Sequence, residues 1–131
     1  MTQIHTVNNS PNRLKFERRT QYVYCRLPRK DQDYFALRRT LQDIAEESFR
    51  FECPLILVED NILNEMELGD ILQLVRDLPM IGFARSRLAI VNRRINHRET
   101  NEFANTVAKN RSIPMRAFDS VGAAETWLLA S

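Results

Sequence analysis

The sequence has few of the residues on which several kinds of chemistry depend. Its 131 residues include only three glycines, two histidines and two cysteines. A phosphate-binding loop needs clustered glycines, whereas Gly69, Gly82 and Gly122 are far apart in the chain. A four-ligand zinc site would need both cysteines and both histidines, and no pair of them has ligand spacing. The sequence therefore predicts neither a glycine-rich nucleotide site nor a metal site, and we expect no cofactor.

Long apolar runs are also scarce. The N-terminal segment lacks the apolar core of a secretory signal, and no later stretch approaches the roughly 18–20 apolar residues of a membrane-spanning helix. We therefore expect a cytoplasmic protein without membrane insertion. In a reducing compartment, Cys25 and Cys53 are expected to be packed thiols rather than disulfide-bonded or redox-active ones.

Neither sign of charge dominates the chain, but charge is segregated along it. The 19 basic and 17 acidic residues give a net charge of +2. Between Glu59 and Asp77, six acidic residues and one arginine give −5, whereas five arginines between Arg85 and Arg98 give +5. Arginine suits bidentate pairing with carboxylates or phosphates better than lysine does. The weak overall field argues against nucleic acid as a partner.

The composition that remains fits one compact α/β domain. Hydrophobic residues make up 44% of the chain and charged residues 27%, which allows a substantial core. Residues 1–12 are polar and end in a turn-forming cluster. We therefore expect a flexible leader over residues 1–12, with a short strand near Ile4, and a single domain over residues 13–131.

Hydrophobic periodicity predicts alternating strands and helices. The β-rich runs 14–18 and 22–27 are expected to pair as antiparallel strands, or to form one long bent strand. A helix capped by Asp31 should follow and end near Phe49, with one apolar face formed by residues at steps of three and four from Tyr34 to Phe49. The remaining expected elements are strands at 55–58, 88–91 and 115–118, a helix capped by Asn64 and stopped by Pro79, a helix at 100–110, and a final helix capped by Asp119 or Ser120 that buries Ala124, Trp127 and Leu128.

The order β-β-α-β-α-β-α-β-α predicts an α/β fold with a mostly parallel central sheet and an N-terminal antiparallel strand pair. Strands that alternate with helices of this length need right-handed crossovers between parallel strands. The apolar runs at 55–58 and 88–91 are typical of strands that are covered on both faces.

Two segments carry a resemblance to a known family. The strand Arg87–Val91 and the ending Met115–Asp119, followed by Ala124 and Trp127–Leu128, resemble a bacterial branch of the SpoIIAA-like family, whose fold is that of the STAS domain (sulfate transporter and anti-sigma-factor antagonist). The resemblance covers nearly the whole chain after the leader. It implies a small α/β sandwich that works as a non-catalytic interaction module and binds a protein partner or a small anionic ligand.

The chain departs from that family at its regulatory loop. In the anti-sigma-factor antagonists, a serine between the third strand and the second helix is phosphorylated and switches partner binding. Residues 58–64 contain no serine or threonine here, and Glu59, Asp60 and Asn61 form an acidic loop instead. The resemblance therefore implies a module without the serine switch, in which fixed carboxylates stand where phosphate charge would be added. A response-regulator receiver is also disfavoured, because its acceptor aspartate should end a later buried strand, whereas the strand at 88–91 is directly followed by Asn92.

The best candidate for an anion site or partner site is the loop after residues 88–91. It contains Arg93, Arg94, His97 and Arg98. The loop follows the carboxyl end of a parallel strand and leads into a helix N-terminus, where the helix dipole and the arginines both favour a negative charge.

Two alternatives to anion binding follow from neighbouring residues. Adjacent parallel strands would bring Glu59 and Asp60 to the same sheet edge, so these carboxylates could pair with Arg93 and Arg94 and leave no site. A small enzyme or anion-handling protein would use the two arginines with His97, although no nucleophile or orienting carboxylate stands at an identifiable spacing from this histidine. We therefore expect His97 to lie on the surface of the loop rather than to act as a general base.

Two further surfaces give weaker predictions. Tyr22 and Tyr24 share one strand face near Arg18 and Arg26, as in some nucleic-acid modules, but alternating aromatics are more often core residues. The apolar segment 78–83 is expected to fold beneath the second helix, and the alternative is an exposed patch that forms a homodimer.

Overall fold

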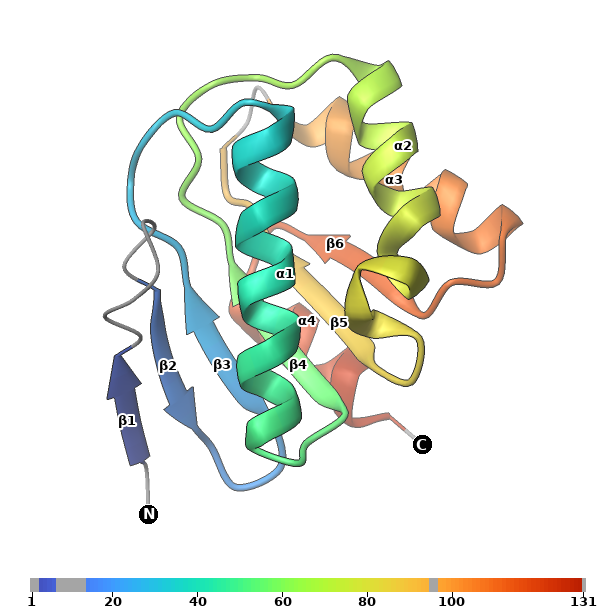
Figure 1. The fold of residues 1–131 in the computed structure, drawn as a ribbon. Coiled ribbons are helices and arrows are strands. Elements are labelled where there is room, and N and C mark those ends of the chain that lie inside the picture. Colours follow the sequence, from blue (N-terminus) through green and yellow to red (C-terminus); the bar gives the residue numbers. More distant parts are fainter. Residues whose placement is uncertain (1–2, 7–13, 95–96, 131) are drawn as a thin grey trace.

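The computed structural model describes residues 3–6, 14–94 and 97–130. In chain order its elements are β1 (Gln3–Thr6), β2 (Lys15–Arg18), β3 (Val23–Arg26), α1 (Tyr34–Arg50), β4 (Leu55–Glu59), α2 (Leu68–Leu78), a π-helical turn η1 (Pro79–Phe83), β5 (Arg87–Val91), α3 (Arg98–Asn110), β6 (Met115–Phe118) and α4 (Val121–Leu129). The predicted α/β class is confirmed (Figure 1).

The strands form one mixed sheet in the order β1-β2-β3-β4-β5-β6. β1, β2 and β3 pair antiparallel, and β3 to β6 pair parallel. A turn closed by the hydrogen bond from Arg19 N to Tyr22 O (2.9 Å) separates β2 from β3, so the runs form two strands rather than one bent strand. β1 is the short strand predicted near Ile4, and it extends the sheet by pairing with the outer edge of β2.

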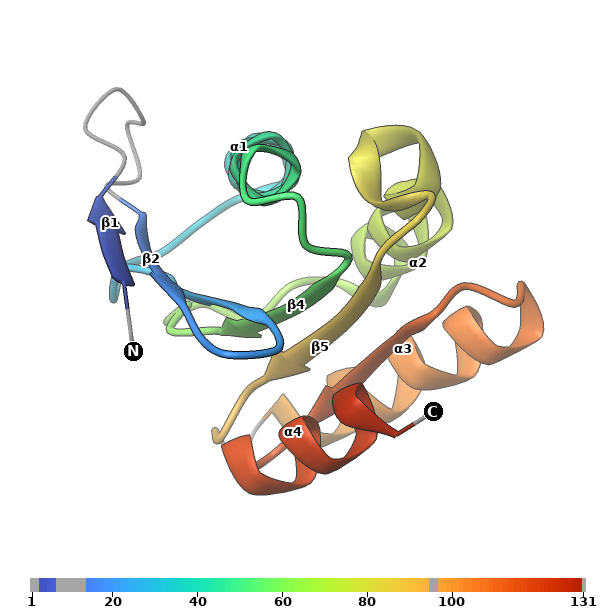
Figure 2. The same ribbon diagram turned by 90° about the horizontal axis from the view of Figure 1, so that it is seen from below.

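The helices divide between the two faces of the sheet. α1 and α2 lie on one side and α4 on the other (Figure 2). Ile56 and Val58 belong to the large core beneath α1, α2 and α3, whereas Leu57 belongs to a smaller core beneath α4. Because successive side chains of a strand point to opposite faces, a strand covered on both faces needs the unbroken apolar run seen here.

Two of the predicted helix caps are wrong. Asp33, and not Asp31, caps α1, because its carboxylate accepts the backbone N–H three residues further on (2.8 Å). Asn64 caps no helix, since α2 begins four residues later. Its side chain instead accepts from Gln32 N (2.6 Å) and donates to Gln32 O (2.8 Å). It therefore joins the loops that follow β3 and β4.

The apolar segment after α2 folds against α1. α2 ends at the predicted proline, but the chain continues into η1, which packs on α1. Ile81 and Phe83 are buried, while Met80 is 76% exposed. Gly82 has φ +143°, and a Cβ at this position would lie 2.6 Å from Ala45 Cβ. Both the backbone conformation and the close approach to α1 therefore require glycine.

Two aromatic residues are more exposed than predicted. Phe49 is 85% exposed, because the buried stripe of α1 continues through Ser48 at this end. Trp127 is half-buried, with the Arg87 guanidinium 3.9 Å from its ring centroid. Ser120 is the cap of α4, as one of the two predicted alternatives.

The cysteines and the helix lengths agree with the sequence analysis. Cys25 is buried and Cys53 half-buried, and both are free thiols. Burial raises the pKa of Cys25, which keeps it protonated. In the described part of the chain, no helix combines the length and the apolar character needed to cross a membrane.

Candidate functional site

The acidic loop and the arginine loop meet at the carboxyl edge of the parallel strands, as predicted. β4 and β5 are neighbours, with Glu59 paired to Val91 in the register. Asp60 N donates to Val91 O (2.8 Å), and Asn92 N donates to Phe118 O (2.8 Å). These backbone hydrogen bonds carry the strand pairing into the loops and hold them side by side.

Glu59 forms the ion pair that the sequence analysis gave as an alternative to a site. Its carboxylate lies 3.4 Å from Arg93 Nη2 and also accepts a hydrogen bond from the Tyr24 hydroxyl. The Arg93 side chain is 60% exposed and that of Glu59 only 20%. Arg93 is therefore partly neutralised by a carboxylate that Tyr24 holds in place.

The Asp60 side chain points to the face of the sheet opposite to that of Glu59, and it forms no ion pair with any of the described residues. Oδ1 accepts from Ile62 N (2.8 Å), and Oδ2 lies 3.4 Å from Asn92 Nδ2. Burial raises the pKa of Asp60 to about 6, and the Ile62 hydrogen bond and the positive charge of Arg94 offset only part of this rise. Asn61, the third predicted residue of the acidic loop, is half-buried.

Strand alternation is the signal that separates these two carboxylates. Glu59 lies two residues after Leu57, so its side chain points to the same face as that of Leu57, toward α4. Asp60 lies two residues after Val58, so its side chain points toward the large core. The sequence predicts that the two side chains point to opposite faces, but it does not predict what covers each face.

His97 is buried rather than placed on the loop surface as predicted. It is 5% exposed, and its Nδ1 lies 2.8 Å from Asn92 Nδ2. Arg94 N donates to Asn92 Oδ1 (3.2 Å), which assigns the amide orientation and makes Nδ2 the donor to the ring. Burial lowers the pKa of His97, as does the nearby Arg94. The ring is therefore neutral at physiological pH, with its proton on Nε2.

The three predicted arginines gather around a surface pocket of about 210 Å³. Arg94 and Arg98 are exposed, and neither forms an ion pair with a carboxylate of the described residues. α3 begins at Arg98, so the positive end of its dipole faces the same region. The residues that line the pocket are Asn92, Arg93, Arg94, Arg98, Asn101 and Asp119.

Two lining residues were missed by the sequence analysis. Asn101 lies one helical turn after Arg98, and Asp119 follows β6, the strand next to β5. The periodicity of α3 and the adjacency of the strand ends are signals that could have identified them. His97, in contrast, does not line this pocket. Residues 95–96 of the predicted loop lie outside the described residues.

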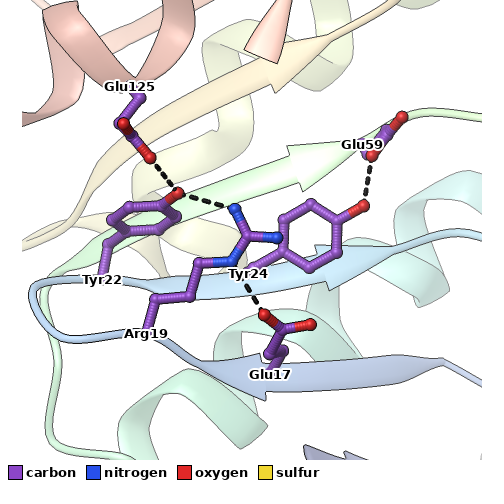
Figure 3. A network of polar contacts seen from close by, with 6 residues as sticks. All are labelled: Glu17, Arg19, Tyr22, Tyr24, Glu59 and Glu125. Atoms are coloured by element: carbon purple, nitrogen blue, oxygen red, sulfur yellow. Dashed lines mark hydrogen bonds and ion pairs between the residues drawn. The ribbon is translucent and has the colours of Figure 1, made fainter. Parts of the chain in front are cut away.

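The two tyrosines considered for nucleic acid are engaged within the protein (Figure 3). The Tyr22 hydroxyl accepts from Arg19 Nη1 (2.8 Å) and donates to Glu125 (2.5 Å). The Arg19 guanidinium lies 4.1 Å from the Tyr24 ring centroid and is itself paired with Glu17 at 3.0 Å. The exposed face of this strand is thus covered by arginine and carboxylates, and stacking of a base on Tyr24 would have to displace Arg19.

Neither a metal cluster nor a relative identifies the site. Over residues 3–6, 14–94 and 97–130, no group of three or more histidine, cysteine, aspartate and glutamate residues could hold a metal ion. No protein-family model matches the sequence, and no curated protein matches it significantly. Geometry and electrostatics therefore carry the functional argument.

Proposed function

We propose that this protein is a non-catalytic binding module that holds a small anionic ligand in the pocket formed by Arg93, Arg94 and Arg98. The observation that supports this most is the pair of exposed guanidinium groups of Arg94 and Arg98 on one pocket, without a paired carboxylate among the described residues. Arginine forms charge-assisted, often bidentate hydrogen bonds with phosphate and carboxylate groups. The start of α3 adds the helix dipole at the same place.

The size and charge of the pocket suit one anionic group. Its volume of about 210 Å³ is below the roughly 300–1,000 Å³ of pockets for drug-sized ligands. Glu59 already pairs with Arg93, so Arg94 and Arg98 would supply most of the attraction. Asn101 would add a neutral amide, while the Asp119 carboxylate would disfavour ligands with charge spread over a large surface.

Support for a binding role over an enzymatic one comes from His97. A small enzyme at this edge would need His97 as a general base facing the arginine pocket. The ring is instead buried on the other side of Asn92, with Nδ1 occupied by the Asn92 amide. Glu59 and Asp60 also point to different faces, so they do not form a pair of cooperating carboxylates.

We also propose that the chain is a SpoIIAA-like domain and that it is located in the cytoplasm. The segments that carry the resemblance form β5, β6 and α4, which are the elements the resemblance requires. The loop between β4 and α2 contains no serine or threonine, so binding would be constitutive. The free thiols Cys25 and Cys53 are consistent with a reducing compartment.

Calorimetric titration with inorganic phosphate tests this function. In the double variant Arg94→Ala, Arg98→Ala, affinity should fall about tenfold or more, because each charge-assisted hydrogen bond contributes roughly 1.5–3 kcal/mol. The control carries Arg39→Ala and Arg111→Ala, two exposed arginines outside the pocket. Equal affinity in the two double variants, or no binding by the unmodified protein, would contradict the proposal.

A further inference from the structure

A cavity of about 100 Å³ lies on the side of the sheet that α1, α2 and α3 cover. Its walls are mostly apolar and include Leu41 from α1, Leu74 from α2 and Ala104 from α3. A smaller chamber of about 50 Å³ adjoins it, since Asp60 and Asn92 line both. The two chambers share five lining residues, and together they offer an apolar body and a polar end, as in many small-molecule sites.

The polar end contains one unused hydrogen-bond donor. His97 lines the smaller chamber with Asp60, Asn92 and Thr100. Because Nδ1 accepts from the Asn92 amide, the neutral ring carries its hydrogen on Nε2. Nε2 is buried, and no described residue accepts a hydrogen bond from it. Leaving a buried donor without an acceptor is unfavourable, so the site favours a ligand that supplies one.

We infer that this space is a second binding site, for a small neutral apolar molecule that carries one hydroxyl group. The apolar part of the ligand occupies the larger chamber between Leu74 and Ala104. Its hydroxyl oxygen accepts from His97 Nε2–H, and its hydroxyl hydrogen is donated to the Asp60 carboxylate, which lines the same chamber. A hydroxyl both accepts and donates, so it satisfies both groups at once.

The volume limits the ligand to about one ring. The larger chamber, about 100 Å³, is somewhat smaller than the ~150 Å³ apolar cavity that binds benzene in another protein. The two chambers together reach that size, which fits a phenol or a short alcohol and excludes long acyl chains.

The ligand chemistry separates this site from the proposed anion pocket. An anion in the smaller chamber would stand beside the Asp60 carboxylate, so it is disfavoured there. A neutral phenol, in turn, gains little from the arginines on the surface. Asn92 lines both places. The inference does not depend on the proposed function.

NMR titration of the full chain with phenol, benzene and benzoate tests the inference. Phenol should bind about tenfold more tightly than benzene, since its hydroxyl gains two hydrogen bonds in a buried site. It should shift the amide resonances of Asp60 and Ala104, whereas benzoate should leave these unchanged. In His97→Phe, which replaces the imidazole with a phenyl ring and so removes Nε2–H, phenol and benzene should bind within about threefold of each other.

A second pair of variants locates the ligand. Ala104→Leu fills the larger chamber and should weaken phenol and benzene by about tenfold or more. Ala123→Leu adds the same side chain at an exposed position of α4 and should change neither affinity. Equal weakening by the two variants would overturn the inference.

The tautomer of His97 can be tested in the unmodified protein, which keeps the inference falsifiable if His97→Phe does not fold. Imidazole ¹⁵N spectra should show the hydrogen on Nε2 and a shift of this resonance when phenol is added. A hydrogen on Nδ1, an Nε2 resonance that phenol does not move, or equal affinity of the unmodified protein for phenol and benzene would each overturn the inference.

Discussion

Replacing Asp60 with asparagine should stabilise this protein at neutral pH and have little effect in acid. Burial raises the pKa of the folded carboxyl group from its ordinary 3.8 to about 6. The folded state therefore holds a proton more tightly than the unfolded state does, and stability must fall as pH rises through the folded pKa. Asparagine is neutral at every pH and can still accept the hydrogen bond from Ile62 N.

The size of the effect follows from the shift. A difference of about two pKa units corresponds to about 3 kcal/mol at 1.36 kcal/mol for each unit. Near pH 8, where Asp60 is ionised in both states, Asp60→Asn should be more stable than the unmodified protein by up to this amount. Near pH 4.5, the folded carboxyl is protonated and the unfolded one is mostly ionised, so the difference should shrink by about 2 kcal/mol.

Urea denaturation of both proteins at the two pH values measures this difference directly. Asp31→Asn serves as the control, because it makes the same substitution at an exposed position. A stability difference that does not change with pH would contradict this prediction. So would a variant that is less stable than the unmodified protein near pH 8, because the ionised carboxylate would then be a favourable part of the fold.

Two further predictions concern the scaffold around the site. Gly82→Ala should lower the free energy of unfolding by about 2 kcal/mol or more, because of backbone strain and the clash with Ala45. Gly122→Ala, in open space on α4, should instead raise it by about 0.5–1 kcal/mol. Melting temperatures that shift in the same direction in the two variants would contradict this prediction. Asn105 braces the edge strand β6 by donating to Ala117 O (3.1 Å) and accepting from Ala117 N (2.7 Å). Asn105→Ala should cost about 2 kcal/mol and speed hydrogen exchange at the Ala117 amide, and an unchanged exchange rate would contradict the bracing role.

Most of the element order could be predicted because the signal is local. The unbroken apolar run before Glu59 indicates a strand covered on both faces, and strand alternation with helices indicates parallel neighbours. Helix starts were less predictable. Asp31 and Asp33 are both acceptable caps in the sequence, and only the path of the chain from β3 to α1 selects Asp33. Asn64 is also an acceptable cap in the sequence, but its side-chain amide forms two hydrogen bonds with the backbone of Gln32, in a loop distant in sequence.

The candidate site shows the same division. The sequence alone predicts that carboxylates and arginines follow neighbouring parallel strands and meet at one edge, because strands that follow one another in the chain usually lie side by side in the sheet. Which charges pair depends on the three-dimensional packing. Glu59 faces the side of Tyr24 and binds Arg93, while Asp60, one residue later, faces the core and meets Asn92. Because a strand is pleated, consecutive side chains point to opposite faces, but the packing of helices on each face determines which residues each side chain contacts.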